Sequence, residues 1–513
     1  MPRLLGSSAA AAAILAAGAC GGGAPAGGLG DTLGYFPAEA GLVVAVSTDL
    51  DDEQFEVLEN ELTRPLFGQS VDTLLRLGAD QAGLSYEDDV EPLLGRELLV
   101  GTQARELGGD EDPGLTVVFQ ATDGERLRET LGRLGAQEVG EEDGATFYVV
   151  PIVDVALALD GDVLVAARGE ELVRAAVERN AAGEGLDEET FDAALDGLPA
   201  DALVRIYGDP TVLGGRPELE RLRSVPWFGA LVSVGATLTF AEDELRVEAV
   251  ANTDAGSLSE ADLPLAAGPD APGLVRSDDE IAGGNLNQSL TTVFLLRTAE
   301  AAAPDSRFVQ DVHALEEELG IDFAAEILRQ FDGPSVSLLS PDGRDFAARS
   351  VVRDPERLRA HLAQLAPVLP ELIQDLNGLR SQGLALLLLF APDAPALPAA
   401  LSGVQVEEPT SPDGLYHVTG LTGDGPAELW FGLDGDLFVV ASDEGRARAI
   451  AEADTEAVDG ARGAGVTRIG PGALREVLAG RIGRERASFG DLVASLDAST
   501  EEIRARVRLA WAD

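Results

Sequence analysis

Few side chains in this sequence are placed to do chemistry. The three histidines, His313, His361 and His417, are far apart, and no two of them have the four-residue spacing of a helical metal site. No GxSxG nucleophile elbow is present, and the absence of lysine excludes a P-loop and a Schiff-base lysine. We therefore predict that the protein is not an enzyme, that it has no catalytic, cofactor-binding or metal-binding residues, and that its histidines are surface or satisfied side chains.

Clustered carboxylates are the remaining candidates for chemistry. They lie at residues 49–53, 109–112 and 342–345 and could supply oxygen ligands to Ca²⁺, but none has the spacing of an EF-hand loop. In so acidic a chain, solvated loops are the simpler interpretation. A hydrolase that uses two facing carboxylates remains an alternative, although no pattern marks such a pair.

The only cysteine, Cys20, ends a run of apolar and small residues that begins after Arg3. This run is too short and too weakly hydrophobic for a stable transmembrane helix, and it has the anatomy of a secretory signal. Residues 15–20 (LAAGAC) resemble a bacterial lipobox. That resemblance implies cleavage before Cys20, a diacylglycerol thioether on its sulfur and acylation of the new amine. The alternative is ordinary cleavage after residues 17–19, which would leave Cys20 as an incidental thiol.

The lipobox interpretation also predicts where the protein lies. Residues 1–19 are the expected lipoprotein signal peptide, and the glycine-rich residues 20–33 the expected flexible tether. No later apolar run approaches the ~20 residues that a transmembrane helix needs. We expect a monomer at the outer face of the cytoplasmic membrane, in the cell envelope, whose only membrane partner is the bilayer reached through lipidated Cys20.

The charge balance excludes several partners. The chain has 90 acidic and 37 basic residues, all of the latter arginine, and a formal net charge of −53. Such a field repels nucleic acid and anionic lipid surfaces. Two explanations remain open: a GC-biased genome that encodes arginine in place of lysine, with acids as a solubilising shell, or adaptation to a saline medium in which salt screens the self-repulsion.

The elements that must position these side chains are organised around a repeated unit. Residues 157–179 read as an apolar strand, a turn at Asp160-Gly161, a second apolar strand and a helix, and residues 431–453 repeat the pattern with a turn at Asp434-Gly435. The recurring LDGD turns have a structural explanation, because glycine tolerates positive φ and aspartate bonds to its own backbone.

Further landmarks recur in the same order. Residues 123–128 match 354–359, residues 204–213 resemble 467–478, and residues 243–251 resemble 501–510. We therefore predict an α+β fold of two similar domains from an internal duplication, each a largely antiparallel sheet with packed helices. The expected domains are 34–253 and 278–513, joined by a linker at 254–277.

The second copy has an insertion at about 366–402, which includes the apolar run LALLLLFA. One interpretation is an extra helix and a buried segment over a sheet edge or the other domain. The other is an apolar flap over a lipid-sized cavity, or a wedge that touches the membrane.

Three segments together resemble an uncharacterised bacterial envelope protein family, domain of unknown function 3352. They are residues 35–46 (YFPAEAGLVVAV), 84–100 (LSYEDDVEPLLGRELLV) and 159–177 (LDGDVLVAARGEELVRAAV). The resemblance implies secreted or lipid-anchored proteins and carries no site residues. We predict a non-enzymatic, lipid-anchored extracytoplasmic protein that binds a ligand or envelope partner; a carrier of lipid or another apolar molecule is the alternative from a different class.

Overall fold

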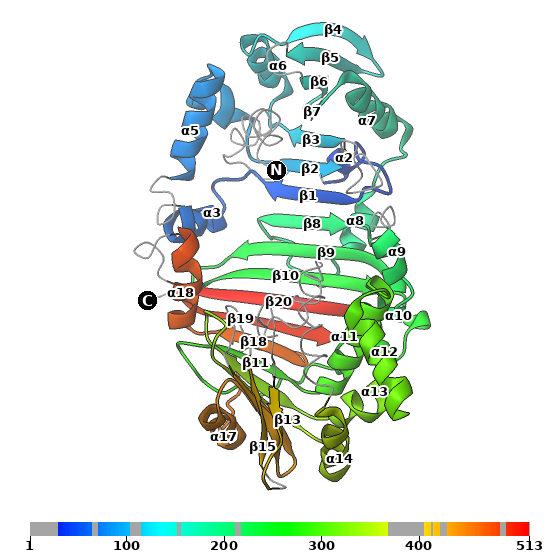
Figure 1. Ribbon diagram of the computed structural model, residues 1–513. Helices are drawn as coiled ribbons and strands as arrows, with labels where there is room; N and C mark the ends of the chain where they lie inside the picture. Colours follow the sequence, from blue (N-terminus) through cyan, green and yellow to red (C-terminus); the bar gives the residue numbers. More distant parts are fainter. Residues whose placement is uncertain are drawn as a thin grey trace. The chain divides into compact units, whose positions relative to one another are not determined.

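The computed structural model describes residues 29–63, 70–102, 114–150, 155–210, 217–367, 405–411, 414–420, 428–482 and 489–511. Cys20, the acidic cluster at 109–112 and the insertion from residue 368 onward lie outside these ranges. The chain divides into two compact units. Figure 1 labels their helices and strands. Unit 1 comprises Met1–Pro217 and Leu231–Asn252, and unit 2 comprises Glu218–Ala230 and Thr253–Asp513.

The described strands of unit 1 form one antiparallel sheet. Their order is β4, β5, β6, β7, β3, β2, β1, β8, β9, β10. Their bounds are β1 (Leu42–Ser47), β2 (Glu97–Thr102), β3 (Leu115–Gln120), β4 (Gln137–Glu142), β5 (Ala145–Val150), β6 (Val155–Asp160), β7 (Val163–Ala167), β8 (Val204–Gly208), β9 (Leu231–Phe240) and β10 (Glu244–Thr253).

Helices of unit 1 occupy the connections between these strands. The main ones are α3 (Glu53–Val57), which continues as a π-helical stretch at Leu58–Thr63, α5 (Val71–Ala82), α6 (Gly124–Arg133), α7 (Glu170–Ala182) and α8 (Glu188–Ala194). Helix α7 packs on β6 and β7 because it buries Val173, Ala176 and Val177, a spacing that places all three on one face. It ends where Gly183 adopts the left-handed conformation, with φ +67°.

The described strands of unit 2 form an antiparallel sheet with the order β14, β15, β16, β17, β13, β12, β11, β18, β19, β20. Their bounds are β11 (Ile281–Asn285), β12 (Ser335–Leu339), β13 (Phe346–Val351), β14 (Gln405–Glu407), β15 (Leu415–Thr419), β16 (Leu429–Asp434), β17 (Leu437–Ala441), β18 (Gly465–Ile469), β19 (Phe489–Ala498) and β20 (Glu502–Trp511). Numbered from the first strand of each unit, the two orders are the same.

The helices of unit 2 include α10 (Pro226–Gly229), α11 (Gln288–Ala302), α12 (Arg307–Leu319), α13 (Phe323–Glu326), α14 (Pro355–Leu365), α17 (Glu444–Glu452) and α18 (Pro471–Ile482). Helix α17 packs on β13 and β17 and buries Ala447 and Ile450. Helix α10 belongs to unit 2 although it precedes β9 in sequence. Its Trp227 packs edge-on against Phe294 of α11, with ring centroids 6.1 Å apart.

A buried arginine ties the end of the predicted linker to the unit 2 sheet. Arg468 of β18, 8% exposed, donates two hydrogen bonds of 2.8 and 3.0 Å to the Asp491 carboxylate. It also donates to the Ser277 carbonyl at 2.6 Å and to Asp278 at 3.1 Å. The paired carboxylates and the carbonyl together offset the cost of burying the guanidinium.

The predicted α+β class with antiparallel sheets is confirmed. The repeated unit becomes β6, β7 and α7 in unit 1 and β16, β17 and α17 in unit 2. The predicted final hairpin of the first half, with arms near 231–240 and 244–251, is β9 and β10. Within the described ranges, no helix combines the length and hydropathy needed to cross a bilayer.

Candidate functional site

The LDGD turns are two-residue hairpin loops. Asp160 pairs with Val163 across the first turn and Asp434 with Leu437 across the second. Gly161 and Gly435 are the first loop residues, with φ of +62° and +63°. A glycine with positive φ at the first loop position is typical of type II′ turns. The backbone twist of these turns matches the right-handed twist of the strands that they connect. The geometry gives these four residues a structural role.

Each turn also holds the segment that leads into a neighbouring helix. The Asp162 carbonyl accepts a hydrogen bond of 2.9 Å from Ala121 N, and the Asp436 carbonyl accepts one of 2.8 Å from Val352 N. The next helices, α6 and α14, are both capped by an aspartate side chain, Asp123 or Asp354. The matching motifs at 123–128 and 354–359 are therefore helix starts.

In unit 1, Asp160 has a second partner. The hydroxyl of Tyr35, which is 2% exposed, donates a 2.9 Å hydrogen bond to Asp160 Oδ2. Burial first, and then the charge of Asp160, raise the pKa of the Tyr35 hydroxyl. Arg179 of α7 donates to the Tyr35 carbonyl at 2.8 Å. These contacts fasten the segment that precedes β1 onto the repeated unit.

The structure does not bring the three histidines together. His417 of β15 stacks on Trp430 with centroids 4.0 Å apart and lies between Glu407, at 3.4 Å, and Glu428, at 3.0 Å. His361 lies 3.5 Å from Glu326, and His313 lies 3.4 Å from Glu300. Among the described residues, no group of three or more histidine, cysteine, aspartate or glutamate side chains is arranged to hold a metal ion.

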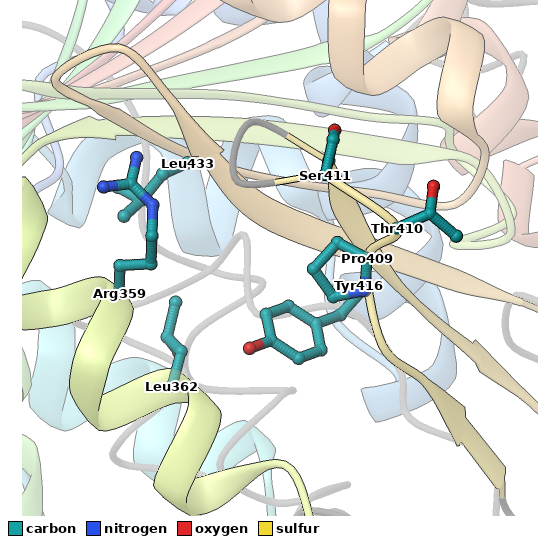
Figure 2. Close-up of a pocket in the computed structure, with 8 residues that line it drawn as sticks. Arg359, Leu362, Pro409, Thr410, Ser411, Tyr416 and Leu433 are labelled. Atoms are coloured by element: carbon teal, nitrogen blue, oxygen red, sulfur yellow. The ribbon is translucent and has the colours of Figure 1, made fainter.

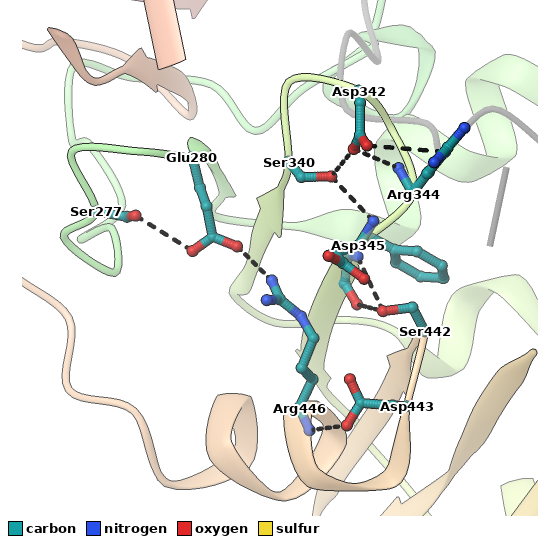
Figure 3. Close-up of polar contacts among 10 residues, drawn as sticks. Ser277, Glu280, Ser340, Asp342, Arg344, Asp345, Ser442, Asp443 and Arg446 are labelled. Carbon is teal, nitrogen blue, oxygen red and sulfur yellow. Dashed lines mark hydrogen bonds and ion pairs between the residues drawn. The ribbon is translucent and has the colours of Figure 1, made fainter. Parts of the chain in front are cut away.

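The acidic cluster at 342–345 is a hairpin turn between β12 and β13 (Figure 3). The Asp342 carboxylate accepts hydrogen bonds from the Ser340 hydroxyl at 2.6 Å and from Arg344 N at 3.1 Å. These two bonds lower the pKa of the Asp342 carboxyl, the hydroxyl contributing most. In the cluster at 49–53, Asp52 caps α3 in a similar way. The oxygen atoms of both aspartates therefore serve the local backbone.

Figure 3 also shows a polar contact from outside this turn. Glu280 accepts a hydrogen bond from the Ser277 hydroxyl at 3.2 Å and forms an ion pair with Arg446 of α17. The Ser442 hydroxyl accepts from Phe346 N at 3.2 Å. These bonds join the end of the linker, the β13 strand and α17, so they stabilise unit 2 and present no open site.

Within the described residues, a pocket of about 300 Å³ in unit 2 is a candidate ligand site (Figure 2). One wall comes from α14 and the other from the chain between β14 and β15 together with β15 and β16. The described residues that line it are Arg359, Leu362, Pro409, Thr410, Ser411, Gly414, Tyr416 and Leu433. The wall thus combines apolar side chains with one guanidinium and three hydroxyls.

Helix α14 presents Arg359 and Leu362 to the pocket. The helix begins at the Asp354 cap with Pro355 in its first turn, a position where proline loses no hydrogen bond. Leu358, Leu362 and Leu365 are buried and define the face that packs on the sheet. Because Arg359 is three residues from Leu362, both side chains lie on the pocket side of this face (Figure 2).

The strands hold the opposite wall in place. The Tyr416 ring stacks on Phe431 of β16 with centroids 5.0 Å apart and planes 7° apart. Tyr416 is 6% exposed and Leu433 is 3% exposed. Burial, and secondarily the charge of Glu408, raise the pKa of the Tyr416 hydroxyl, so this group stays a protonated donor at neutral pH. For that hydroxyl, the part of the chain that the structure describes supplies no hydrogen-bond partner.

Pro409 explains why the sheet leaves room at this point. In unit 1, β4 and β5 stay paired up to Glu142 and Ala145, next to the turn. In unit 2, pairing of β14 with β15 stops at Glu407 and His417, and the chain leaves the ladder. Pro409 has no N–H, so it cannot donate a ladder hydrogen bond to β15 beyond Glu407.

None of the pocket residues was predicted from the sequence to have a site role. Arg359 entered the sequence analysis only as the last residue of the matching 354–359 motif. The available signal was proline in the arm before the turn, at Pro409, where the corresponding arm of the first copy, residues 137–142, has no proline.

A family model described as "Protein of unknown function (DUF3352)" matches residues 4–366. The chain belongs to this family. The DUF3352 match ends at the C-terminus of α14, so it includes Arg359 and Leu362 but not the strand wall of the pocket. A search of curated proteins finds no match.

Among solved structures, crystal forms of the treponemal protein TP0453 are similar to this DUF3352 chain. Form III is 11% identical, with 43% of this chain and 79% of that chain covered and a TM-score of 0.26. Form IV is 10% identical, with 43% and 80% covered and a TM-score of 0.27. Form I is 10% identical, with 43% and 78% covered and a TM-score of 0.24. Scores this low establish neither the fold nor a function of this chain.

Proposed function

We propose that this protein is a non-enzymatic, lipid-anchored extracytoplasmic binding protein that holds a small ligand in the unit 2 pocket. The observation that carries the proposal is the pocket of about 300 Å³ between α14 and β15–β16. Concave, mainly apolar sites with a few convergent polar groups are typical of small-molecule binding. The described lining residues supply apolar side chains, one guanidinium and three hydroxyls, groups that can contact a ligand and fix its orientation.

A pocket-blocking variant tests the binding function. Thr410 lies at the exposed rim, so Thr410→Trp should obstruct the pocket without disturbing the core. We expect native mass spectrometry of gently extracted full-length protein to show a small bound mass in the wild type and its loss in the variant. The ligand should be released chemically unchanged. If the wild type and Thr410→Trp carry the same bound masses, the pocket is not the ligand site.

The lipid anchor is supported by the lipobox-like residues 15–20 and the glycine-rich residues that follow. We expect wild-type protein to fractionate with membranes and to incorporate a labelled fatty acid. Cys20→Ala should abolish the label and release the body from the membrane. Cys20→Ala that remains membrane-bound would contradict the anchor and leave the pocket proposal intact.

The internal duplication is supported by the matching orders of the two sheets and by their matched details. Both units have a II′-like LDGD hairpin, an aspartate-capped helix that follows, and a long final hairpin. We propose that the two units descend from one ancestral domain. Experimental structures of the two units that superpose poorly over these ten strands would contradict this origin.

A second candidate function is carriage of lipid or another apolar molecule. It is favoured by a partly exposed apolar strip on the unit 1 sheet, where Leu42 is 37% exposed, Val232 58% and Val234 36%. Leu42 and Val234 both pair with Gly208, so they flank a position without a side chain. Lipid bound to Thr410→Trp as well as to the wild type would support carriage on this strip.

A further inference from the structure

We propose that His417 is a pH-sensitive clamp that joins β14, β15 and β16 in the unit 2 sheet. In its protonated form the imidazole bridges two carboxylates, Glu407 of β14 and Glu428, which directly precedes β16. In its neutral form it bonds to one of them. A closed clamp also orders the strand wall of the pocket, and this regulatory step rests on the proposed binding function.

The strand register places the groups of the clamp side by side. His417 pairs directly with Glu407 on β14 and with Trp430 on β16, so the three side chains lie on one face of the sheet. Nδ1 of His417 lies 3.4 Å from a carboxylate oxygen of Glu407, and Nε2 lies 3.0 Å from one of Glu428. The imidazole is 17% exposed and stacks on the Trp430 ring, with centroids 4.0 Å apart and planes 16° apart. The stack therefore holds the imidazole between the two carboxylates.

The two carboxylates favour one protonation state of the imidazole. An ionised carboxylate only accepts hydrogen bonds, whereas a neutral imidazole has one N–H donor and one lone pair. A neutral His417 therefore donates to one glutamate, while its other nitrogen sets a lone pair against the second carboxylate. An imidazolium has two N–H donors, so both contacts become charge-assisted hydrogen bonds. The clamp is closed in acid and opens as the pH rises through the range in which histidine loses its charge.

Other charged groups of the neighbouring elements are engaged elsewhere. Within the described ranges, Glu407 and Glu428 are the charged side chains that contact His417. Glu408, the next residue of the chain, acts on Tyr416, whose side chain lies on the opposite face of β15. Helix α17 packs over the His417 face, since it shares an apolar cluster with Leu415. Its arginines form ion pairs with other glutamates, Arg446 with Glu280 and Arg448 with Glu444.

The clamp lies where the strand wall of the pocket begins. Glu407 and His417 form the last pair of the β14–β15 ladder, and the chain then continues into residues 409–411, which line the pocket. Tyr416 precedes His417 and lines the pocket from the other face of the strand. A closed clamp therefore orders this wall at acidic pH. An ordered wall binds a ligand more tightly because less conformational freedom is lost on binding.

Hydrogen–deuterium exchange of the full-length protein tests the clamp at pH 5.5 and pH 8.0, on either side of the ordinary histidine pKa of about 6.5. Each variant is compared with the wild type at the same pH, so the pH dependence of intrinsic exchange cancels. At pH 5.5, the amides of residues 405–419 should exchange about two- to five-fold faster in His417→Gln, the range that partly exposed ion pairs support. At pH 8.0 the difference should largely disappear.

Glu407→Gln separates charge from packing, because the Glu407 side chain is 69% exposed and glutamine has the same shape. The glutamine amide can donate to the lone pair of a neutral imidazole. This variant should therefore exchange faster than the wild type at pH 5.5 and no faster at pH 8.0. His313→Gln is the control, since His313 has one carboxylate neighbour, Glu300 at 3.4 Å, and lies on α12. It should leave residues 405–419 unchanged at both pH values.

The exchange results can overturn the clamp. If His417→Gln and Glu407→Gln change exchange equally at the two pH values, the contacts are structural and the clamp is not pH-sensitive. If neither variant changes exchange at pH 5.5, the clamp does not exist. Circular dichroism and melting temperatures establish that each variant is folded.

Native mass spectrometry after dialysis at the two pH values tests the regulatory step. We expect the wild type to retain its bound small molecule at pH 5.5 and to lose more of it at pH 8.0, and Glu407→Gln to reduce this difference. Equal retention at both pH values would refute regulation of the pocket while binding stands. If the wild type carries no mass that Thr410→Trp removes, the binding function fails with its regulation, and the exchange results still decide the clamp.

Discussion

At the scale of single residues, Tyr35 shows how a buried polar side chain can fasten a segment to the core. Its hydroxyl donates to Asp160 at 2.9 Å, and its ring is 2% exposed. A hydrogen bond to a charged group contributes about 1.5–3 kcal/mol. We expect Tyr35→Phe to lower the free energy of unfolding of unit 1 by about that amount, because the ring still packs while the Asp160 carboxylate loses its donor. Urea unfolding measures the difference.

The same residue predicts an alkaline sensitivity. Burial and Asp160 raise the pKa of the Tyr35 hydroxyl, so the folded state keeps the proton at a pH where the unfolded chain has lost it. Its stabilising contribution is complete below the ordinary tyrosine pKa of about 10 and is lost as the pH rises above that value. Tyr35→Phe should reduce the fall in stability above pH 10. Equal falls in the wild type, Tyr35→Phe and Asp160→Asn would contradict this account.

At the scale of secondary-structure elements, the LDGD hairpins were predictable because their signal is local. Alternating or continuous apolar residues, one glycine and a helical period lie within residues 157–179 and within 431–453. The pocket was not predictable in the same way. It depends on where the β14–β15 ladder stops and on how α14 lies over β15 and β16, which involve residues far apart in sequence. Arg359 and Arg128 stand in nearly identical motifs, so sequence alone does not separate them.

The two turn glycines predict matched effects in the two units. Gly161 and Gly435 have φ of +62° and +63°, and nothing lies within 4 Å of an added Cβ at either position. An alanine there meets no clash and is penalised only by its left-handed backbone, at about 1–2 kcal/mol. We expect Gly161→Ala and Gly435→Ala each to destabilise the unit that contains it by that amount in urea unfolding.

Gly132 of α6 is the control for these substitutions. It lies in a helix, and an added Cβ there also meets nothing within 4 Å. Gly132→Ala should therefore stabilise unit 1 by about 0.5–1 kcal/mol, the opposite sign. If Gly161→Ala left the free energy of unfolding unchanged while Gly132→Ala raised it, the first hairpin would not depend on the positive φ of Gly161.

At the scale of the whole molecule, the dominant property is the formal net charge of −53. Self-repulsion of this size destabilises compact states, and salt shortens its range from about 10 Å at 0.1 M to about 3 Å at 1 M. If the acidity is an adaptation to a saline medium, the melting temperature should climb steeply with NaCl, with most of the rise below about 1 M. Sucrose at matched osmolality is the control, since it favours burial without screening charge. A flat response to NaCl up to molar concentration would leave the GC-biased composition as the explanation. A rise that sucrose reproduces would assign the effect to exclusion of solute from the surface.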